Sequence, residues 1–335
     1  MSMFKKPSEL QAKPGLVAMI YGQPGSGKST LACSAPGAVM LDYDGGVNRI
    51  NGAHQVPTLQ IKTWEETGEA LKEIKESPEI TSVLIDTVGK QLAFMEDYIK
   101  RNVTFSKGGN PVEINRDGSL SMKGFGRRKQ MFVDFIKEIT VLGKNIIFIA
   151  HDKEDKDGDL RYFRPDAGGS SGTDLMRELD LVGYMQIIGN QRTITFTPTG
   201  AYYAKDTCGM PGIIPVPLLI NDNGENVGEN NFFCKVIDSY KRRIKSNLEN
   251  NKKLDSLKID IEQNLKYVND AQSANKYVEW CKGLNHVYNS AAIAKSAISK
   301  KAKELGLIFD QITKSYTDPI QQESDEKDNG DGKDD

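Results

Sequence analysis

The sequence predicts an α/β domain with a mostly parallel central sheet, followed by a smaller helical module. From Gly15 to about Leu219, short apolar runs alternate with stretches of helical periodicity, which is typical of a parallel sheet with helices on its faces. After residue 235 the apolar residues fall at helical spacing instead. A chain of 335 residues is long enough for one large domain with a buried core and a second, small one.

Five apolar runs bounded by Gly, Asp, Asn or Pro are the expected parallel strands. They span Leu16–Tyr21, Ala38–Asp42, Ser82–Ile85, Asn145–Ala150 and Leu181–Ile188. Arg192–Pro198 then alternates polar and apolar residues after a Gly-Asn pair, which predicts a late antiparallel hairpin. The segment Ile213–Leu219 contains two prolines and is expected to be extended and to leave the core.

Changes of composition set the expected domain boundaries. We expect an N-terminal arm over 1–14, the α/β core over 15–220, a linker over 221–235, an all-helical module over 236–317 and an acidic tail over 318–335. The helical module holds 15 Lys and Arg against 9 Asp and Glu, a net charge of +6. Residues 321–335 hold seven acidic residues, two lysines and no apolar residue, so the tail is expected to be disordered.

Bulk composition excludes several classes of protein. The net charge of −2 gives no overall attraction to nucleic acid, so such a function has to depend on local charge. The four cysteines are scattered without metal-ligand spacing, which favours reduced thiols and a cytoplasmic location. The N-terminus has no apolar signal core, and apolar runs such as Ile146–Ala150 are too short to cross a membrane.

The strongest motif follows the first expected strand and reads Gly-x-x-x-x-Gly-Lys-Ser, a phosphate-binding loop. Its glycines let backbone N–H groups surround a phosphate, Lys28 is expected to reach the β- and γ-phosphates, and Ser29 is expected to hold Mg²⁺. The alternative is a chance match in a Gly-rich turn. The expected nucleotide-binding residues are Gly22, Gln23, Pro24, Gly25, Ser26, Gly27, Lys28, Ser29 and Thr30.

Polar residues at the ends of three other strands are candidate catalytic groups. Asp86 ends an apolar strand and is expected to hold the Mg²⁺ shell, although a helix cap is the alternative. Asp44 is expected to polarise the attacking water, with Asp42 as its competitor and ordinary Asp-Gly turn chemistry as the alternative. His151 follows the fourth strand and is either a sensor of the γ-phosphate or a structural histidine.

These motifs in this order resemble the core-only RecA-like ATPases of phages, a family of phage nucleotide-binding proteins that includes single-strand annealing recombinases. The resemblance spans about residues 15–212 and is carried by 22–30, 41–46, 84–87, 148–154 and 204–206. It implies a RecA-like core that uses ATP and Mg²⁺ and acts on single-stranded DNA in phage recombination, by annealing or strand exchange. It also implies an oligomer in the host cytoplasm, with single-strand-binding protein as a further partner.

The same resemblance assigns roles to two residues that spacing alone does not identify. Lys205 is similar to the lysine that reaches the γ-phosphate of a neighbouring subunit, which would place the complete ATP site between protomers. Asp44 stands where the family usually carries a glutamate, so its shorter side chain implies slow turnover.

Two segments after the third and fourth strands are the expected DNA-binding loops. Residues 100–130 hold eight Lys and Arg against two acidic residues, and Phe105 and Phe125 are placed to stack on bases; the alternative is a solvated loop and helix face. Residues 151–166 have a net charge of −2, so either only their Arg-Tyr-Phe-Arg tip touches DNA or the acidic residues bind something else. The expected DNA-binding residues are Arg127, Arg128, Lys129, Arg161 and Arg164.

Two other functions remain open from the sequence. A P-loop ATPase can be a motor or switch whose target is a protein rather than DNA, and the basic segment 100–130 discriminates between these targets. A small-molecule phosphotransferase is the third possibility, but the sequence has no clear Arg-rich lid after the phosphate-binding loop.

Overall fold

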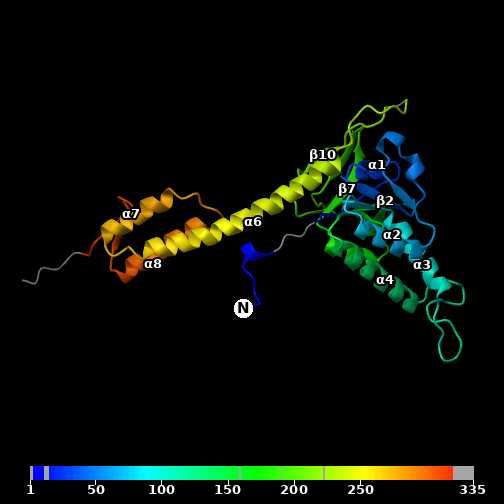
Figure 1. Cartoon of the computed structure of the whole chain (residues 1–335), viewed down its shortest axis with the longest axis horizontal. Coiled ribbons are helices and arrows are strands. Elements are labelled where there is room, and N and C mark those ends of the chain that lie inside the picture. The colour runs from blue at the N-terminus through cyan, green and yellow to red at the C-terminus, as the bar shows by residue number, and fades with distance from the viewer. Residues whose placement is uncertain (1–2, 11–14, 158–159, 190, 222, 320–335) are drawn as a thin grey trace, which may run out of the picture. The chain divides into compact units, whose positions relative to one another are not determined.

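The computed structural model describes residues 3–10, 15–157, 160–189, 191–221 and 223–319, so most of the acidic tail and part of the N-terminal arm lie outside the described residues. The chain forms two compact units, one over residues 12–243 and one that joins residues 244–335 to residues 1–11 (Figure 1). Helix α6 (Phe232–Leu265) contributes residues to both units. No helix among the described residues is long and apolar enough to cross a membrane.

The larger unit is built on a ten-stranded sheet whose main path runs β10-β8-β7-β1-β5-β4-β2-β3. Six strands pair in parallel with one another, namely β1, β2, β3, β4, β5 and β7. The other pairs are antiparallel and join β8 and β9 to β7, β10 to β8, and β6 to β5. This arrangement confirms the α/β fold class with a mostly parallel sheet and a late antiparallel hairpin. The bounds are β1 (Val17–Gly22), β2 (Ala38–Asp42), β3 (Thr58–Gln60), β4 (Ser82–Asp86), β5 (Asn145–Asp157), β6 (Leu160–Pro165), β7 (Leu181–Ile188), β8 (Gln191–Thr195), β9 (Lys205–Asp206) and β10 (Ile213–Pro215).

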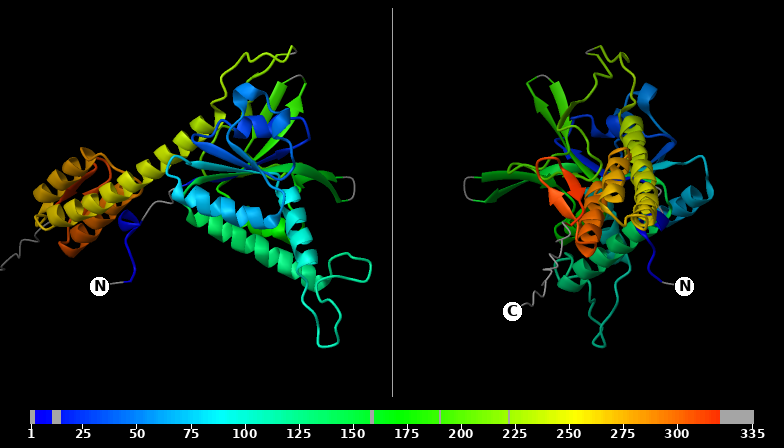
Figure 2. Two further views of the ribbon diagram at one scale, coloured as in Figure 1. Left: turned by 45° about the vertical axis from the view of Figure 1, so that its right-hand side comes forward. Right: turned by 90° about the vertical axis from the view of Figure 1, so that its left-hand side faces the viewer.

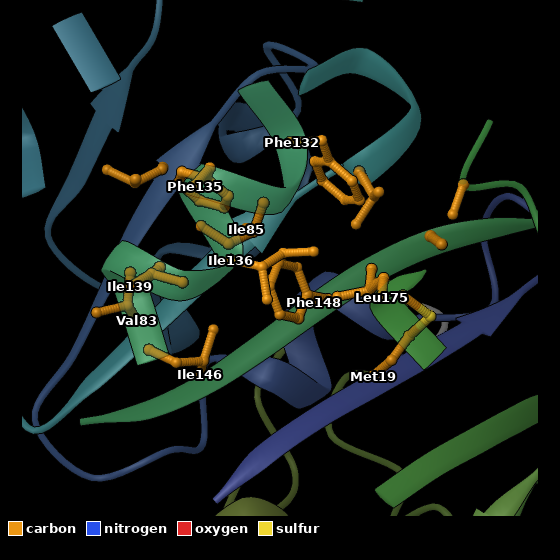
Figure 3. Packing of buried hydrophobic residues seen from close by; sticks show 14 of the residues in the cluster. Met19, Val83, Ile85, Phe132, Phe135, Ile136, Ile139, Ile146, Phe148 and Leu175 are labelled. Atoms are coloured by element: carbon orange, nitrogen blue, oxygen red, sulfur yellow. The ribbon is translucent and has the colours of Figure 1, made fainter. Parts of the chain in front are cut away.

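Helices cover both faces of this sheet (Figure 2) because its central strands are apolar on both faces. Side chains of α2 (Trp64–Glu76), α3 (Val88–Arg101), α4 (Met122–Val141) and α5 (Ser170–Glu178) join one buried cluster with the sheet. Figure 3 shows Phe132, Phe135 and Ile136 of α4 packed over strand residues such as Phe148. On the other face, α1 (Lys28–Ala32) and the first turns of α6 are joined where Phe233 N–H donates to Ser34 Oγ at 2.8 Å.

Strand β5 is more than twice as long as the predicted strand Asn145–Ala150, and it is followed directly by β6. The segment 151–166, which the sequence predicts to be a loop, is therefore mostly a β-hairpin. Its charged residues pair across the two strands: Arg161 Nε lies 3.4 Å from Glu154 Oε1, and Arg164 pairs with Asp155. These ion pairs are diagonal across the two strands, and a count of net charge does not detect them.

Two further segments differ from expectation. The segment Ile213–Leu219 does not simply leave the core, because β10 pairs with β8 at the edge of the sheet. Helix α6 begins at Phe232, so residue 236 lies inside a helix rather than at the start of a module.

The smaller unit is mainly helical, as expected, but it also contains a hairpin that the sequence does not predict. Its elements are the later part of α6, α7 (Ala271–Lys282), α8 (Ser290–Glu304), β11 (Ile308–Asp310) and β12 (Ser315–Thr317). Short 3₁₀ helices lie at Pro7–Glu9 in this unit and at Val47–Arg49 and Gly52–His54 in the larger one.

Candidate nucleotide-binding site

The loop that follows β1 has a backbone that only glycine satisfies at two positions. Gly22 has a φ of +152°, and a Cβ there would lie 2.2 Å from the carbonyl oxygen of Met185. Gly27 has a φ of +92° and precedes the first residue of α1. The loop therefore turns sharply at the carboxyl end of a buried strand and exposes backbone groups there, as a phosphate-binding loop requires.

Lys28 lies inside this loop rather than on the surface. Its Nζ donates to the carbonyl oxygens of Gly22 at 2.8 Å and Gln23 at 2.7 Å. Burial lowers the pKa of the Lys28 amine, while the nearby carboxylates of Asp152 and Asp86 act in the opposite direction. A buried cation held by two carbonyl oxygens and, at 3.5 Å, the Ser26 hydroxyl is well placed to exchange these contacts for the oxygens of a polyphosphate.

Ser29 and Asp86 come from neighbouring elements and touch directly. The Ser29 hydroxyl donates to Asp86 Oδ2 at 2.5 Å. Burial raises the pKa of Asp86 to about 6, and the carboxylates of Asp42 and Asp44 add to this effect. A hydroxyl and a carboxylate are hard oxygen ligands that suit Mg²⁺. The described residues hold no cluster of three or more metal-ligating side chains, so Mg²⁺ would take its other ligands from phosphate and water.

The structure distinguishes the two carboxylates after β2. The Asp42 carboxylate accepts the backbone N–H groups of Asp44, Gly46 and Val47, each at 3.1 Å, so it caps the turn. The Asp44 carboxylate instead lies 3.6 Å from Arg49 and 4.0 Å from Lys90 at partly exposed positions. Asp44 is therefore the carboxylate with access to a water molecule, and its catalytic role stays a prediction.

His151 lies on β5 directly beside the phosphate-binding loop, in register with Gly22 of β1. Its Nδ1 is buried and has no hydrogen-bond partner in the described structure. Burial lowers the pKa of the imidazole, and the positive charge of Lys28 lowers it further, which favours a neutral ring. The ring lines a small cavity of about 270 Å³ with Thr87 and Arg128.

Lys205 lies on β9, the short strand that pairs with β7, and its amine contacts the backbone of its own chain. Its Nζ donates to the carbonyl oxygens of Met176 and Arg177 at 3.2 and 3.3 Å, at the end of α5. No carboxylate within 4.0 Å neutralises it among the described residues. Its role toward a neighbouring subunit stays a prediction.

The five predicted DNA-binding cations all have carboxylate partners within the chain. Arg127 lies 3.5 Å from Glu113, Lys129 lies 3.0 Å from Asp174, and Arg128 pairs with Glu96. Arg161 and Arg164 pair across the β5–β6 hairpin, as described above. These pairs join α4 to α3, to α5 and to the loop before α4, or they join the two strands of the hairpin, so each of these cations already has a carboxylate partner within the chain.

Four other cations of residues 100–130 are exposed and have no carboxylate within 4.0 Å in the described part of the chain. They are Lys100 in the last turn of α3, Lys107 and Arg116 on the loop that joins α3 to α4, and Lys123 in the first turn of α4. The net charge of the segment includes them, but net charge does not distinguish them from cations that have a carboxylate partner. Their position does, because they lie on the loop or in the helical turns next to it, whereas Arg127 and Arg128 lie further along α4.

The site consists of a glycine-rich loop after a parallel strand, a buried lysine, and a serine that donates a hydrogen bond to a strand-end aspartate. Together these features define a P-loop nucleotide-binding domain. The family described as AAA domain matches residues 15–208, more than half of the chain, and the chain belongs to this family. It is therefore a nucleotide-binding domain of the ATPase type, and such domains usually use Mg²⁺. No curated protein matches the chain.

Proposed function

We propose that this protein is a Mg²⁺-dependent ATPase that acts on single-stranded DNA in phage recombination, by annealing or strand exchange. The arrangement of Lys28, Ser29 and Asp86 supports the ATPase activity. The ordered motifs around the sheet edge resemble those of phage recombination ATPases. In this proposal ATP binds at residues 22–30, and a neighbouring copy of the chain contributes Lys205 to the same site.

The observation that carries the DNA part of the proposal is the charge of the loop 102–121. Lys107 and Arg116 lie on this loop and Lys123 lies just beyond it, and all three are exposed and have no carboxylate partner among the described residues. The Phe105 side chain is 67% exposed in the same loop. Free cations beside an exposed ring are the groups that bind phosphates and stack on unpaired bases.

The loop is also ordered and anchored to the core. Two isolated bridges, Phe105 with Pro111 and Ile114 with Leu120, divide it into two tight turns. Glu113 lies at its centre and accepts the backbone N–H of Thr104 at 2.8 Å. The loop follows α3, which begins two residues after Asp86, so one helix connects the nucleotide site to the proposed DNA surface.

The test compares ATP hydrolysis with and without single-stranded DNA at two salt concentrations. The variant is Lys107→Ala/Arg116→Ala/Lys123→Ala, and the matched control removes three exposed lysines of another face, Lys62→Ala/Lys72→Ala/Lys75→Ala. We expect DNA to stimulate the wild type and the control, and the loop variant to keep basal turnover but lose stimulation. The salt dependence of DNA binding should fall by a slope of about 2 in the loop variant, because each phosphate contact contributes about 0.7.

Two results would contradict the proposal. If hydrolysis and binding are indifferent to DNA even at low salt, DNA is not the ligand, and an ATPase that acts on a protein becomes the better interpretation. If DNA stimulates the loop variant as well as the control, DNA binds elsewhere on the chain.

A further inference from the structure

The smaller unit contains a groove of about 890 Å³ between α7, α8 and the β11–β12 hairpin. Its floor is apolar and consists of Val278 on α7, Ala294 and Ile298 on α8, and Leu307 and Phe309 near the hairpin. Alanines on α8 keep this floor deep, and the Phe309 side chain remains 43% exposed. The groove is therefore an open apolar surface, of the kind that marks a binding site for another molecule.

The rim of the groove is uniformly basic. Lys282, Lys295, Lys303 and Lys314 line it, and all four are exposed, while no Asp or Glu is among its lining residues. Lys282 pairs with Glu279 at 2.5 Å, outside the lining. The other three lysines have no carboxylate within 4.0 Å in the described part of the chain. The groove thus combines an apolar floor with a positive rim, three of whose four lysines have no carboxylate partner among the described residues.

The walls of the groove are fixed by internal hydrogen bonds. The Asn275 side chain bonds both backbone groups of Tyr316, at 2.9 and 2.8 Å, and so fastens the hairpin to α7. The two ring nitrogens of His286 contact Ser290 Oγ and the Cys281 carbonyl oxygen, each at 2.9 Å, and so fasten the start of α8 to the end of α7. A groove held in this way does not need to form on binding, which favours affinity.

We infer that this groove docks an acidic segment of a partner protein that carries one or two large apolar side chains. The acidic residues would face the lysine rim, and the apolar side chains would fill the floor. The chain's own residues 321–335 match only half of this chemistry, because they are acidic but contain no apolar residue. The inference concerns the smaller unit alone and does not depend on the proposed DNA function.

The test uses the full chain and a short fluorescent peptide that is rich in Asp and Glu and carries one Leu and one Phe. Two companion peptides replace either the Leu and Phe by Ser or the acidic residues by their amides. The rim variant is Lys295→Glu/Lys303→Glu on α8, and the matched control is Lys276→Glu/Lys300→Glu, on α7 and α8 but outside the groove. A third variant, Ala291→Trp, fills the groove without changing its charge.

We expect the first peptide to bind with an affinity that falls as salt rises. The rim variant should weaken binding at least tenfold, the groove-filling variant should weaken it as well, and the control should leave it within twofold. The inference is overturned if neither companion peptide binds more weakly than the first, or if the rim variant and control behave alike. It is also overturned if no peptide binds, either to the full chain or to a chain that ends at Pro319. If a peptide of residues 321–335 binds as tightly as the first peptide, the occupant of the groove is the chain's own tail and not a partner protein.

Discussion

Replacing Asp86 by asparagine should stabilise the nucleotide-free protein at neutral pH, although Asp86 is a predicted ligand of the Mg²⁺ shell. The carboxylate is buried, and burial is the main reason that its pKa is raised from 3.8 to about 6. An asparagine has the same size, and its carbonyl oxygen can still accept the hydroxyl of Ser29. The substitution therefore removes an unfavourable charge while it keeps the hydrogen bond.

The magnitude and the sign follow from proton linkage. A folded-state pKa above the unfolded value means that the folded protein binds more protons between pH 3.8 and 6, so this group favours folding at low pH and opposes it at high pH. A difference between 3.8 and about 6 corresponds to about 3 kcal/mol of unfolding free energy above pH 7. The advantage of Asp86→Asn should fall to about half this value at pH 5 and to about 0.5 kcal/mol at pH 4.

Urea unfolding followed by Trp64 fluorescence measures this effect. Trp64 packs on Phe135 in the larger unit, and a Trp280→Phe background removes the signal of the smaller unit. The control, Asp97→Asn, makes the same change at an exposed position on α3 and should alter stability by less than about 0.5 kcal/mol. The reasoning is refuted if the Asp86→Asn protein is no more stable than the wild type at pH 7.5, or if its gain in unfolding free energy does not change with pH.

Two further predictions concern turnover. Asp44→Asn should lower ATP hydrolysis by about 10²- to 10⁴-fold and leave nucleotide affinity within a few-fold, because a general base acts in the transition state; an unchanged rate in a single-turnover assay would remove Asp44 from catalysis. If Lys205 completes a neighbour's site, then Lys28→Ala and Lys205→Ala should each be inactive alone. A mixture of the two variants should recover part of the wild-type rate, because some interfaces between them pair an intact Lys28 with an intact Lys205. No recovery in a mixture that still forms oligomers would place both lysines in one protomer's site or remove Lys205 from it.

The sequence predicts which candidate residues lie together at the sheet edge, because these residues belong to local motifs on parallel strands. A Gly-Lys-Ser loop has few conformations available, and the carboxyl ends of parallel strands meet at one edge of the sheet. This is why Asp86 and His151, far apart in sequence, lie beside the loop that contains Lys28. The sequence alone does not distinguish the roles of Asp42 and Asp44. The carboxylate that caps the turn is the one that the backbone N–H groups face, and only the structure shows their directions.

The ligand-binding surface is predicted less well, because charge composition does not show which charges pair. Arg127 and Arg128 seemed available in the sequence, yet their partners Glu113 and Glu96 lie on a loop and a neighbouring helix. The β5–β6 hairpin is hidden in the sequence for the same reason. Its acidic and basic residues look like a polar loop, because the sequence does not show that Arg161 and Arg164 pair diagonally across the two strands with Glu154 and Asp155.

Strand β5 connects the nucleotide site to the β5–β6 hairpin. His151 on this strand lies in register with Gly22 of the phosphate-binding loop, and six residues later the same strand is still paired within the hairpin. If His151 senses the γ-phosphate, as the sequence predicts, a shift at its ring, whose Nδ1 has no partner in the described structure, would pass along this paired strand. We therefore expect a nucleotide-dependent movement to appear first in the hairpin, whereas the loop 102–121, which is connected through α3, should respond to Asp86 instead.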